Sequence, residues 1–464
     1  MPIILVRIFT KNDYGNYALI LLIYLFFWRI LRFGLNQSLF YFIPKYNQGK
    51  KYFITNTYLF FLFVGSLALL LLFVYKDTIS GFFNAPDISS LLPFCGIHIL
   101  FMLISCPFES ILIIESKAEK AAIVALLSEI TRGLSVIIFV IIYKTVAGAM
   151  AGLLCFSFLR FLSYSIFILK YSGIRLDKRN TKYFKEQMQY SLPMGYSGIL
   201  GSIGKRLDKI ILSVFFTPEI FAIYTVGNFK IPFVGMFFQS IGEVILPRCV
   251  EYLQGNKIKE FLQLWNKTIV RLSFVGIGAF FLLQVIAYDL ITMLFTEQYA
   301  SSVPVFRIIL FLIFGQMIAY ATVLKGLGRT KDILKSNVYA FIFSIPTTYG
   351  FVKYFGLPGA AISAVLIFYV NAFSQLFFSI KKLERKFVDV FPVYTILRML
   401  IISVVIFFIL INIQHYFEYL ILKICMSSCI FIIVYSYFCY KTKTFNVFQE
   451  DIFKKIASKF AIAK

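Results

Sequence analysis

The stretch YFITNTYLFFLFVGSLALLLLFVY (Tyr52–Tyr75) contains no charged residue and lies between short polar connections. A helix of about 20 apolar residues, rising 1.5 Å per residue, spans the hydrocarbon core of a bilayer. The stretch therefore predicts a membrane-spanning helix. It decides how the rest of the chain is interpreted, because twelve similar blocks lie before and after it.

These apolar blocks account for most of the chain. Of its 464 residues, 60% are hydrophobic and the mean hydropathy is +0.83, and a soluble protein could not bury so much apolar surface. We predict an all-α polytopic membrane protein, in which residues 3–9 are the tail of an additional, truncated first helix. The thirteen complete spans are approximately 17–43, 52–75, 88–114, 121–143, 147–169, 189–216, 219–247, 267–295, 303–325, 333–354, 358–380, 394–412 and 417–440.

Basic residues are distributed unevenly between the connections. A net charge of +24 in a soluble protein would suggest nucleic-acid binding, but here alternate connections carry 28 Lys and Arg residues on one side and 4 on the other. Basic loops stay on the cytoplasmic side of a membrane. The pattern predicts that the basic tail, 441–464, is cytoplasmic, and it gives no reason to expect nucleic acid as a partner.

Short similarities pair the two halves of the chain. Repeats in the same orientation are a common plan in transporters. We predict two pseudo-symmetric six-helix lobes, 1–170 and 189–380, joined by a basic cytoplasmic linker, 171–188, and followed by two further helices, 394–440. The matched positions are Phe9-Thr10 with Tyr17 and Phe216-Thr217 with Tyr224.

The sequence shows no pattern for enzymatic or metal chemistry. No GxxxxGK[ST] nucleotide-binding loop is present, so ATP hydrolysis by that route is not expected. The seven cysteines lie in or beside apolar segments without metal-ligand spacing, and we interpret them as small hydrophobic residues. We expect no catalytic residue, metal or cofactor, and a transport process driven by an ion gradient, the membrane potential or the substrate gradient.

Eight basic residues lie inside the spans, away from the span ends. A basic residue that faces lipid at mid-depth costs roughly 2.5 to 3.5 kcal/mol, so eight cost on the order of 20 kcal/mol, more than the whole stability of a typical protein. They must face a wet interior or acidic partners. These residues are Arg29, Arg32, Arg132, Arg160, Lys205, Arg206, Lys209 and Lys230.

Nearby carboxylates are too few to neutralise all eight residues. Glu129 lies one turn from Arg132, and Asp208 lies beside Lys209. One interpretation is a set of internal salt bridges that hold helices together. The other, which accounts better for the surplus of positive charge, is a water-filled cavity that binds phosphate or pyrophosphate.

Glycine recurs every third residue before the densest basic cluster. The segment SLPMGYSGILGSIG (Ser191–Gly204) ends directly before Lys205. Proline and glycine weaken a helix and allow close backbone approach, so the segment predicts either tight packing or a hinge that opens the cavity. The candidate hinge residues are Pro193, Gly195, Gly198, Gly201, Gly204 and, in the next span, Pro232.

Three ionisable residues are candidates for coupling to an ion gradient. Asp208 and Glu129 place carboxyl groups within predicted spans, and His98 lies in the span 88–114. A histidine at such a place either exchanges a proton or packs as a hydrogen-bonded core residue, and the packing role is the commoner one.

Three segments resemble one family: RIFTKNDYGNY (Arg7–Tyr17), RLDK (Arg206–Lys209) and GLGRT (Gly326–Thr330). In their order and topology they resemble the Wzx-type polysaccharide flippases of the multidrug/oligosaccharidyl-lipid/polysaccharide exporter superfamily, over nearly the whole chain. The resemblance implies two six-helix lobes around a central cationic cavity. It also implies alternating-access transport of undecaprenyl-pyrophosphate-linked oligosaccharide across the bacterial inner membrane, for O-antigen (lipopolysaccharide), capsule or exopolysaccharide synthesis.

The resemblance further implies functional partners, and two other classes of membrane protein remain as alternatives. The implied partners are the lipid-linked oligosaccharide substrate, membrane lipids, a polysaccharide polymerase and a chain-length regulator. Drug or metabolite exporters of the same superfamily usually handle organic cations, for which a positive cavity is unsuitable. Membrane glycan polymerases and ligases typically carry a large outer loop, whereas the longest outer connection here is 76–87.

Overall fold

Helices make up the regular structure of the protein. The computed structural model describes residues 2–46, 49–171, 178–204, 206–231, 234–317, 320–385, 390–414 and 419–442. Within these ranges every regular element is an α-helix or a 3-10 helix, and ten helical segments are long and apolar enough to cross a membrane. The predicted fold class, an all-α polytopic membrane protein, is confirmed.

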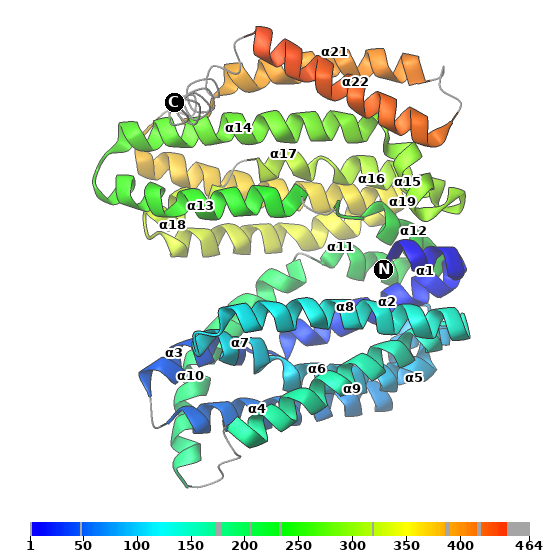
Figure 1. The fold of residues 1–464 in the computed structure, drawn as a ribbon, viewed down its shortest axis with the longest axis vertical. Coiled ribbons are helices and arrows are strands. Elements are labelled where there is room, and N and C mark those ends of the chain that lie inside the picture. Colours follow the sequence, from blue (N-terminus) through cyan, green and yellow to red (C-terminus); the bar gives the residue numbers. More distant parts are fainter. Residues whose placement is uncertain are drawn as a thin grey trace, which may run out of the picture. The chain divides into compact units, whose positions relative to one another are not determined.

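The chain divides into two compact units, which are described separately. Unit 1 comprises Met1–Thr225 and Thr348–Ala360. Its main elements carry the labels α1 to α12 in Figure 1. They are α1 (Pro2–Ile8), α2 (Lys11–Ile30), α3 (Leu35–Lys45), α4 (Lys50–Val74), α5 (Lys76–Phe82), η1 (Pro86–Leu91), α6 (Leu92–Ser105), α7 (Pro107–Ile114), α8 (Ala118–Tyr143), α9 (Val146–Tyr171), α10 (Lys178–Gly204), α11 (Leu207–Phe215) and α12 (Pro218–Gly227), whose last residues belong to unit 2.

Glycines bring the long helices of unit 1 close together. A Cβ on Gly96 of α6 would lie 2.8 Å from the Cα of Leu69 in α4, and one on Gly152 of α9 would lie 2.7 Å from the Cα of Val136 in α8. Close backbone approach of this kind stabilises helix pairs in a bilayer, where lipid tails are as apolar as the helices. The pairs α4–α6 and α8–α9 therefore pack tightly, and α6 also packs against α9.

Two predicted spans of unit 1 are interrupted. The span 17–43 consists of α2 and α3, and the turn between them includes Gly34 with φ of 72°, a conformation that glycine adopts without steric cost. The span 88–114 consists of η1, α6 and α7. Pro107, at the start of α7, has no backbone N–H to continue the hydrogen bonding of α6.

The helix α10 begins within the region predicted as a linker. It packs against α2, α3 and α4. Gln187 of α10 is fully buried and donates from Nε2 to Ser38 Oγ and Thr57 Oγ1, both at 2.9 Å. The boundary between the compact units falls after Thr225, and the two repeated lobes stay a prediction, because packing contacts do not report repeat symmetry.

Unit 2 comprises Val226–Thr347 and Ala361–Lys464. The longest helical segment that the structure describes is shared between the two units, and it is broken at Gly356 of unit 1, where φ is 60°, between the predicted spans 333–354 and 358–380. The elements are α13 (Val234–Gln254), α14 (Ile258–Val285), α15 (Ala287–Phe295), η2 (Glu297–Ser302), α16 (Val303–Ile309), α17 (Leu312–Gln316), α18 (Tyr320–Gly326), α19 (Thr330–Leu383, shared with unit 1), α21 (Val393–Ile413) and α22 (Leu420–Lys441).

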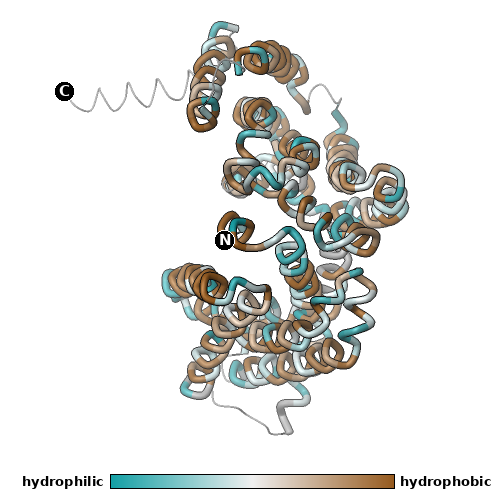
Figure 2. The backbone as a smooth tube through the Cα atoms, turned by 90° about the vertical axis from the view of Figure 1, so that its right-hand side faces the viewer, coloured by the Kyte–Doolittle hydropathy of each residue, from teal (hydrophilic) through white to brown (hydrophobic). Residues whose placement is uncertain are grey.

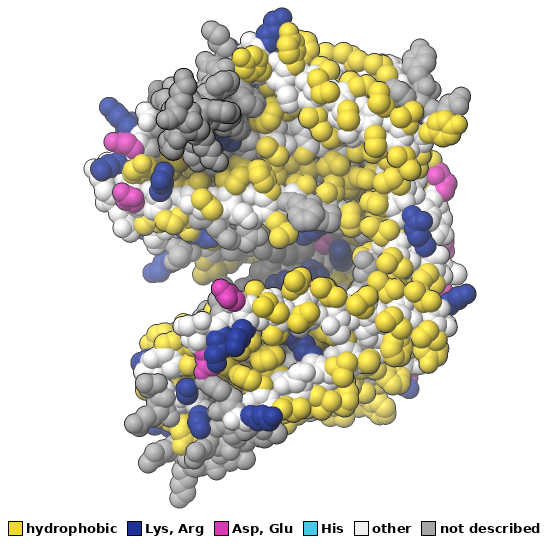
Figure 3. Space-filling view, viewed as in Figure 1, with side chains coloured by type: hydrophobic (Ala, Val, Ile, Leu, Met, Phe, Trp, Pro, Cys, Tyr) yellow, Lys and Arg dark blue, Asp and Glu magenta, His cyan; other side chains and the backbone are white. Residues whose placement is uncertain are grey.

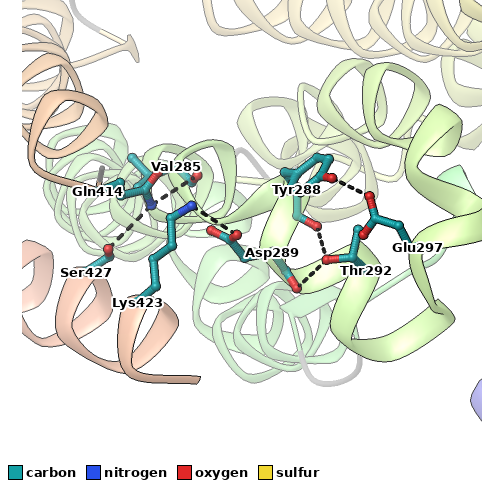
Figure 4. Close-up of polar contacts among 8 residues, drawn as sticks. All are labelled: Val285, Tyr288, Asp289, Thr292, Glu297, Gln414, Lys423 and Ser427. Carbon is teal, nitrogen blue, oxygen red and sulfur yellow. Dashed lines mark hydrogen bonds and ion pairs between the residues drawn. The ribbon is translucent and has the colours of Figure 1, made fainter. Parts of the chain in front are cut away.

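An ion pair ties α22, the last of the described helices, to the body of unit 2 (Figure 4). Lys423 of α22 donates from Nζ to Oδ1 of Asp289 in α15 at 3.2 Å. The Asp289 side chain is 4% exposed and that of Lys423 is 25% exposed. Beside this pair, Gln414 donates to the carbonyl of Val285 and to Ser427 Oγ. The C-terminal helices α21 and α22 also pack against α14, so they form part of unit 2.

Hydrophobic side chains face outward on both units. Figure 2 shows hydrophobic residues along the helices of each unit, and Figure 3 shows a largely hydrophobic surface. On α8, Ile123, Leu126, Leu127 and Ile142 are each more than half exposed. Such a surface is unfavourable in water and is the ordinary surface of a helix that contacts lipid.

Candidate functional site

The end of α2 carries two arginines for which the described residues supply no carboxylate partner. Arg29 lies in the last turn of α2, and Arg32 lies in the turn that follows. The guanidinium carbon of Arg32 lies 5.3 Å from the ring centre of Trp28, and its N–H group donates to the sulfur of Cys106. Among the described residues neither arginine forms an ion pair. Both are therefore available to an external anion.

The break between α6 and α7 places an acidic group beside Arg160 of α9. Ser105 ends α6, and Glu109 lies in the first turn of α7. Arg160 donates from Nε to Ser105 Oγ at 3.2 Å and from a terminal nitrogen to Glu109 Oε1 at 2.5 Å. The side chains of Arg160 and Glu109 are 14% and 21% exposed. A charge-assisted hydrogen bond at such a place is stronger than one on the surface.

Five arginines of unit 1 fall into two sets, which meet at the end of α2 where Arg29 and Arg32 are three positions apart, and together we call them the arginine row. The charges of Arg132 and Arg160 both act on the hydroxyl of Tyr24. Those of Arg160 and Arg32 both act on the thiol of Cys106. The positive charge of Arg29 acts on the guanidinium of Arg206, which precedes α11. The row consists of Arg132, Arg160, Arg32, Arg29 and Arg206.

Carboxylates near the row do not balance its charge. Glu129 pairs with Arg132 one turn away on α8, as predicted. Asp208 is 6% exposed and accepts a hydrogen bond from the hydroxyl of Tyr224 at 2.6 Å. Together with Glu109 these are three acids near five arginines in the part of the chain that the structure describes. A surplus of guanidinium groups favours an anion that accepts paired N–H bonds, such as phosphate.

The three predicted lysines are placed differently. Lys209 is partly buried on α11. Lys230 is exposed and belongs to unit 2, and Lys205 lies outside the described residues. The binding role of all eight basic residues stays a prediction, and the five arginines of the row are those that unit 1 brings together.

His98 is buried among aromatic and backbone groups of unit 1. Its ring centre lies 4.7 Å from that of Tyr24, and it hydrogen-bonds the backbone of Leu153. This arrangement favours the packing role over proton exchange. The coupling roles of His98, Glu129 and Asp208 stay predictions.

The glycine-rich segment is helical up to its end. The helix α10 runs through positions 193, 198 and 201 to Gly204, and α11 begins at Leu207. A helix interruption therefore directly follows the segment, in the place where transporters often carry one. Pro232 lies outside the described residues. Hinge motion at the candidate hinge residues stays a prediction.

Gly195 packs against the turn that carries Arg32. A Cβ on Gly195 would lie 2.9 Å from the Cα, C and O atoms of Phe33. We expect Gly195→Ala to force these backbones apart and to lower the Tm of the purified protein by several degrees, because overpacking typically costs about 1–3 kcal/mol. Gly133→Ala is the matched control, since nothing lies within 4 Å of its added Cβ. Equal Tm values for the two variants would contradict the close approach.

Sequence reasoning missed Glu109 and its neighbours Ser105 and Cys106. The available signal was a carboxyl group inside an apolar span, two residues after Pro107. Hydropathy does not show which basic residue such a group meets, because Arg160 lies 51 positions further along the chain.

The fold is similar to that of solved membrane transporters. A solved structure of the lipid II flippase MurJ in an inward closed conformation aligns with a TM-score of 0.72 and 16% identity, covering 97% of each chain. An inward-facing multidrug resistance MATE family transporter of the MOP superfamily aligns with a TM-score of 0.62 and 14% identity, covering 82% of this chain and 93% of that one. The chain thus shares the fold of these two solved structures.

Sequence comparison identifies the family within this class. A family model described as "Polysaccharide biosynthesis protein" matches residues 4–304, so the chain belongs to that family. The capsular polysaccharide biosynthesis protein CapF of Staphylococcus aureus is 24% identical over 274 residues, which cover 57% of this chain and 69% of CapF. The resemblance to polysaccharide flippases is thereby confirmed at the level of family and fold.

Proposed function

We propose that the protein is a flippase that moves undecaprenyl-pyrophosphate-linked oligosaccharides from the cytoplasmic to the outer leaflet of the bacterial inner membrane by alternating access. The observation that carries the proposal is the arginine row of unit 1, in which Arg29 and Arg32 have no carboxylate partner among the described residues. Its guanidinium groups offer the N–H donors that a pyrophosphate accepts. Membership in a polysaccharide biosynthesis family supports a glycan as the attached group.

The free-energy barrier to moving a pyrophosphate across the membrane is electrostatic. The arginine row lowers this barrier. A pyrophosphate cannot enter hydrocarbon without losing its hydration, which costs far more than thermal energy. Arginines on helices that cross the membrane replace water as hydrogen-bond donors and offset the negative charge. No covalent bond has to form or break, so the chain acts as a transporter and not as an enzyme. The same positive charge disfavours organic cations.

Products of this step would be consumed outside the inner membrane. A lipid-linked repeat unit in the outer leaflet is the substrate that a polysaccharide polymerase needs, and a chain-length regulator acts on the polymer. We therefore include both as functional partners of the proposed flippase, for O-antigen, capsule or exopolysaccharide synthesis.

Deleting the gene tests the proposed function. We expect loss of surface polysaccharide together with accumulation of lipid-linked oligosaccharide in the cytoplasmic leaflet, because synthesis continues while transfer stops. Glycan staining of whole cells and extraction of the lipid-linked fraction measure the two effects. A plasmid copy should restore both to the parental level. Unchanged surface polysaccharide in the deletion strain would reject the proposal.

A further inference from the structure

Glu109 differs from the other acid that pairs with the arginine row. The Glu129 side chain is 66% exposed and pairs with Arg132 on the same helix, whereas that of Glu109 is 21% exposed and reaches Arg160 on a different helix. Exposed pairs within a helix contribute little free energy, while a half-buried pair between helices is held more strongly. Glu109 is therefore the acid that most reduces the positive charge available at the row.

The contacts of Arg160 leave room for a ligand. Its guanidinium has five N–H groups, and among the described residues two of them have partners, Ser105 Oγ and Glu109 Oε1. Both members of the ion pair keep some exposure, 14% for Arg160 and 21% for Glu109. An anion can therefore reach the pair without a prior rearrangement of the helices.

We propose that Glu109 is a positioning residue that holds Arg160 in the empty site and is displaced by the substrate's phosphate groups, so that it limits the affinity of the site and permits release. This inference rests on the proposed function. Carboxylate and phosphate compete for the same guanidinium N–H groups, because both accept them in pairs. An anion that binds Arg160 must therefore displace Glu109.

Ser105 keeps Arg160 in place during this exchange. The hydroxyl of Ser105 is neutral and accepts from Nε, a different nitrogen from the one that donates to Glu109. The charges of Arg160 and Arg32 both act on the thiol of Cys106, the next residue. Arg32 also donates to the sulfur of Cys106, so it is the arginine that we expect to share the displacing anion with Arg160. Without the internal competitor, these arginines would hold the anion too tightly for rapid release.

Calorimetric titration of the purified full-length protein with inorganic pyrophosphate tests the proposal. We expect Glu109→Gln to bind pyrophosphate about tenfold more tightly than the wild type, the change that removal of one competing charge produces. In liposomes the same variant should show a lower KM and a lower kcat for a fluorescent lipid-linked oligosaccharide. A merely structural role of Glu109 predicts weaker binding instead.

Three further variants make the result specific. Glu115→Gln removes a carboxylate that pairs with Lys50 and Lys117, outside the arginine row, and should leave pyrophosphate affinity unchanged. Glu109→Asp keeps the charge and should restore much of the weaker, wild-type affinity. In the double variant Glu109→Gln/Arg160→Gln the tight binding should disappear, because its donor is gone. Tight binding that survives in the double variant would overturn the assignment to Arg160.

The possible failures separate this inference from the proposed function. Wild-type protein that binds pyrophosphate, combined with equal or weaker binding by Glu109→Gln, overturns the inference and leaves the flippase proposal standing. Absence of binding in both proteins overturns the anion site itself. If Glu109→Gln is less stable, pyrophosphate should raise its Tm more than it raises the wild-type Tm, and an equal or smaller rise overturns the inference.

Discussion

Replacing Arg29 and Arg32 together by alanine should abolish polysaccharide export while the protein stays in the membrane at its normal level. Each charge-assisted hydrogen bond contributes about 1.5–3 kcal/mol, so the loss of two guanidinium groups removes about 3–6 kcal/mol of binding free energy, a factor of more than a hundred. Neither side chain forms an ion pair among the described residues, so their removal leaves no unpaired carboxylate behind. Surface glycan staining and immunoblotting of membranes measure the two quantities.

A matched pair of lysines controls for the loss of charge. Lys182 and Lys185 are exposed on α10 of the same unit, and Lys182→Ala/Lys185→Ala removes the same two positive charges away from the arginine row. We expect this variant to export normally. Replacing Arg29 and Arg32 by lysine should leave partial export, because lysine keeps the charge but not the paired N–H geometry. Full export by the alanine variant would remove both arginines from the site.

Asp289→Ala should cause a large loss of stability, with a Tm lower by several degrees. The substitution leaves Lys423 without its carboxylate partner, and breaking a buried pair costs about 3–5 kcal/mol. Because the Lys423 side chain is 25% exposed, its ammonium can turn partly toward water, and we expect the lower end of this range. Thermal unfolding of the purified protein measures the effect.

A second substitution distinguishes the ion pair from simple packing. In Asp289→Ala/Lys423→Met no charge is left unpaired, and most of the lost stability should return. Glu297→Gln is the control, because the carboxylate of Glu297 accepts from Tyr288 on an exposed part of unit 2 (Figure 4). A double variant as unstable as Asp289→Ala would show that the charge pairing of Lys423 is not the cause.

Features that depend on neighbouring positions were predictable from the sequence. Hydropathy identified the spans whose helices are apolar by themselves, and the break at Gly356 separates two of them as expected. The pair Glu129–Arg132 was predictable because residues three apart face the same side of a helix. Interruptions inside spans, such as that at Gly34, were not predicted, since the residues on both sides remain apolar.

The sequence by itself determined that this chain crosses a membrane many times and that its apolar spans carry more arginine and lysine than aspartate and glutamate. Tertiary structure alone decided which of these charges meet. Arg160 and Glu109 are 51 positions apart, and Lys423 and Asp289 are 134 apart. Hydropathy and charge report how each helix interacts with lipid and water, whereas the partner of a buried charge depends on which helix faces share one interior.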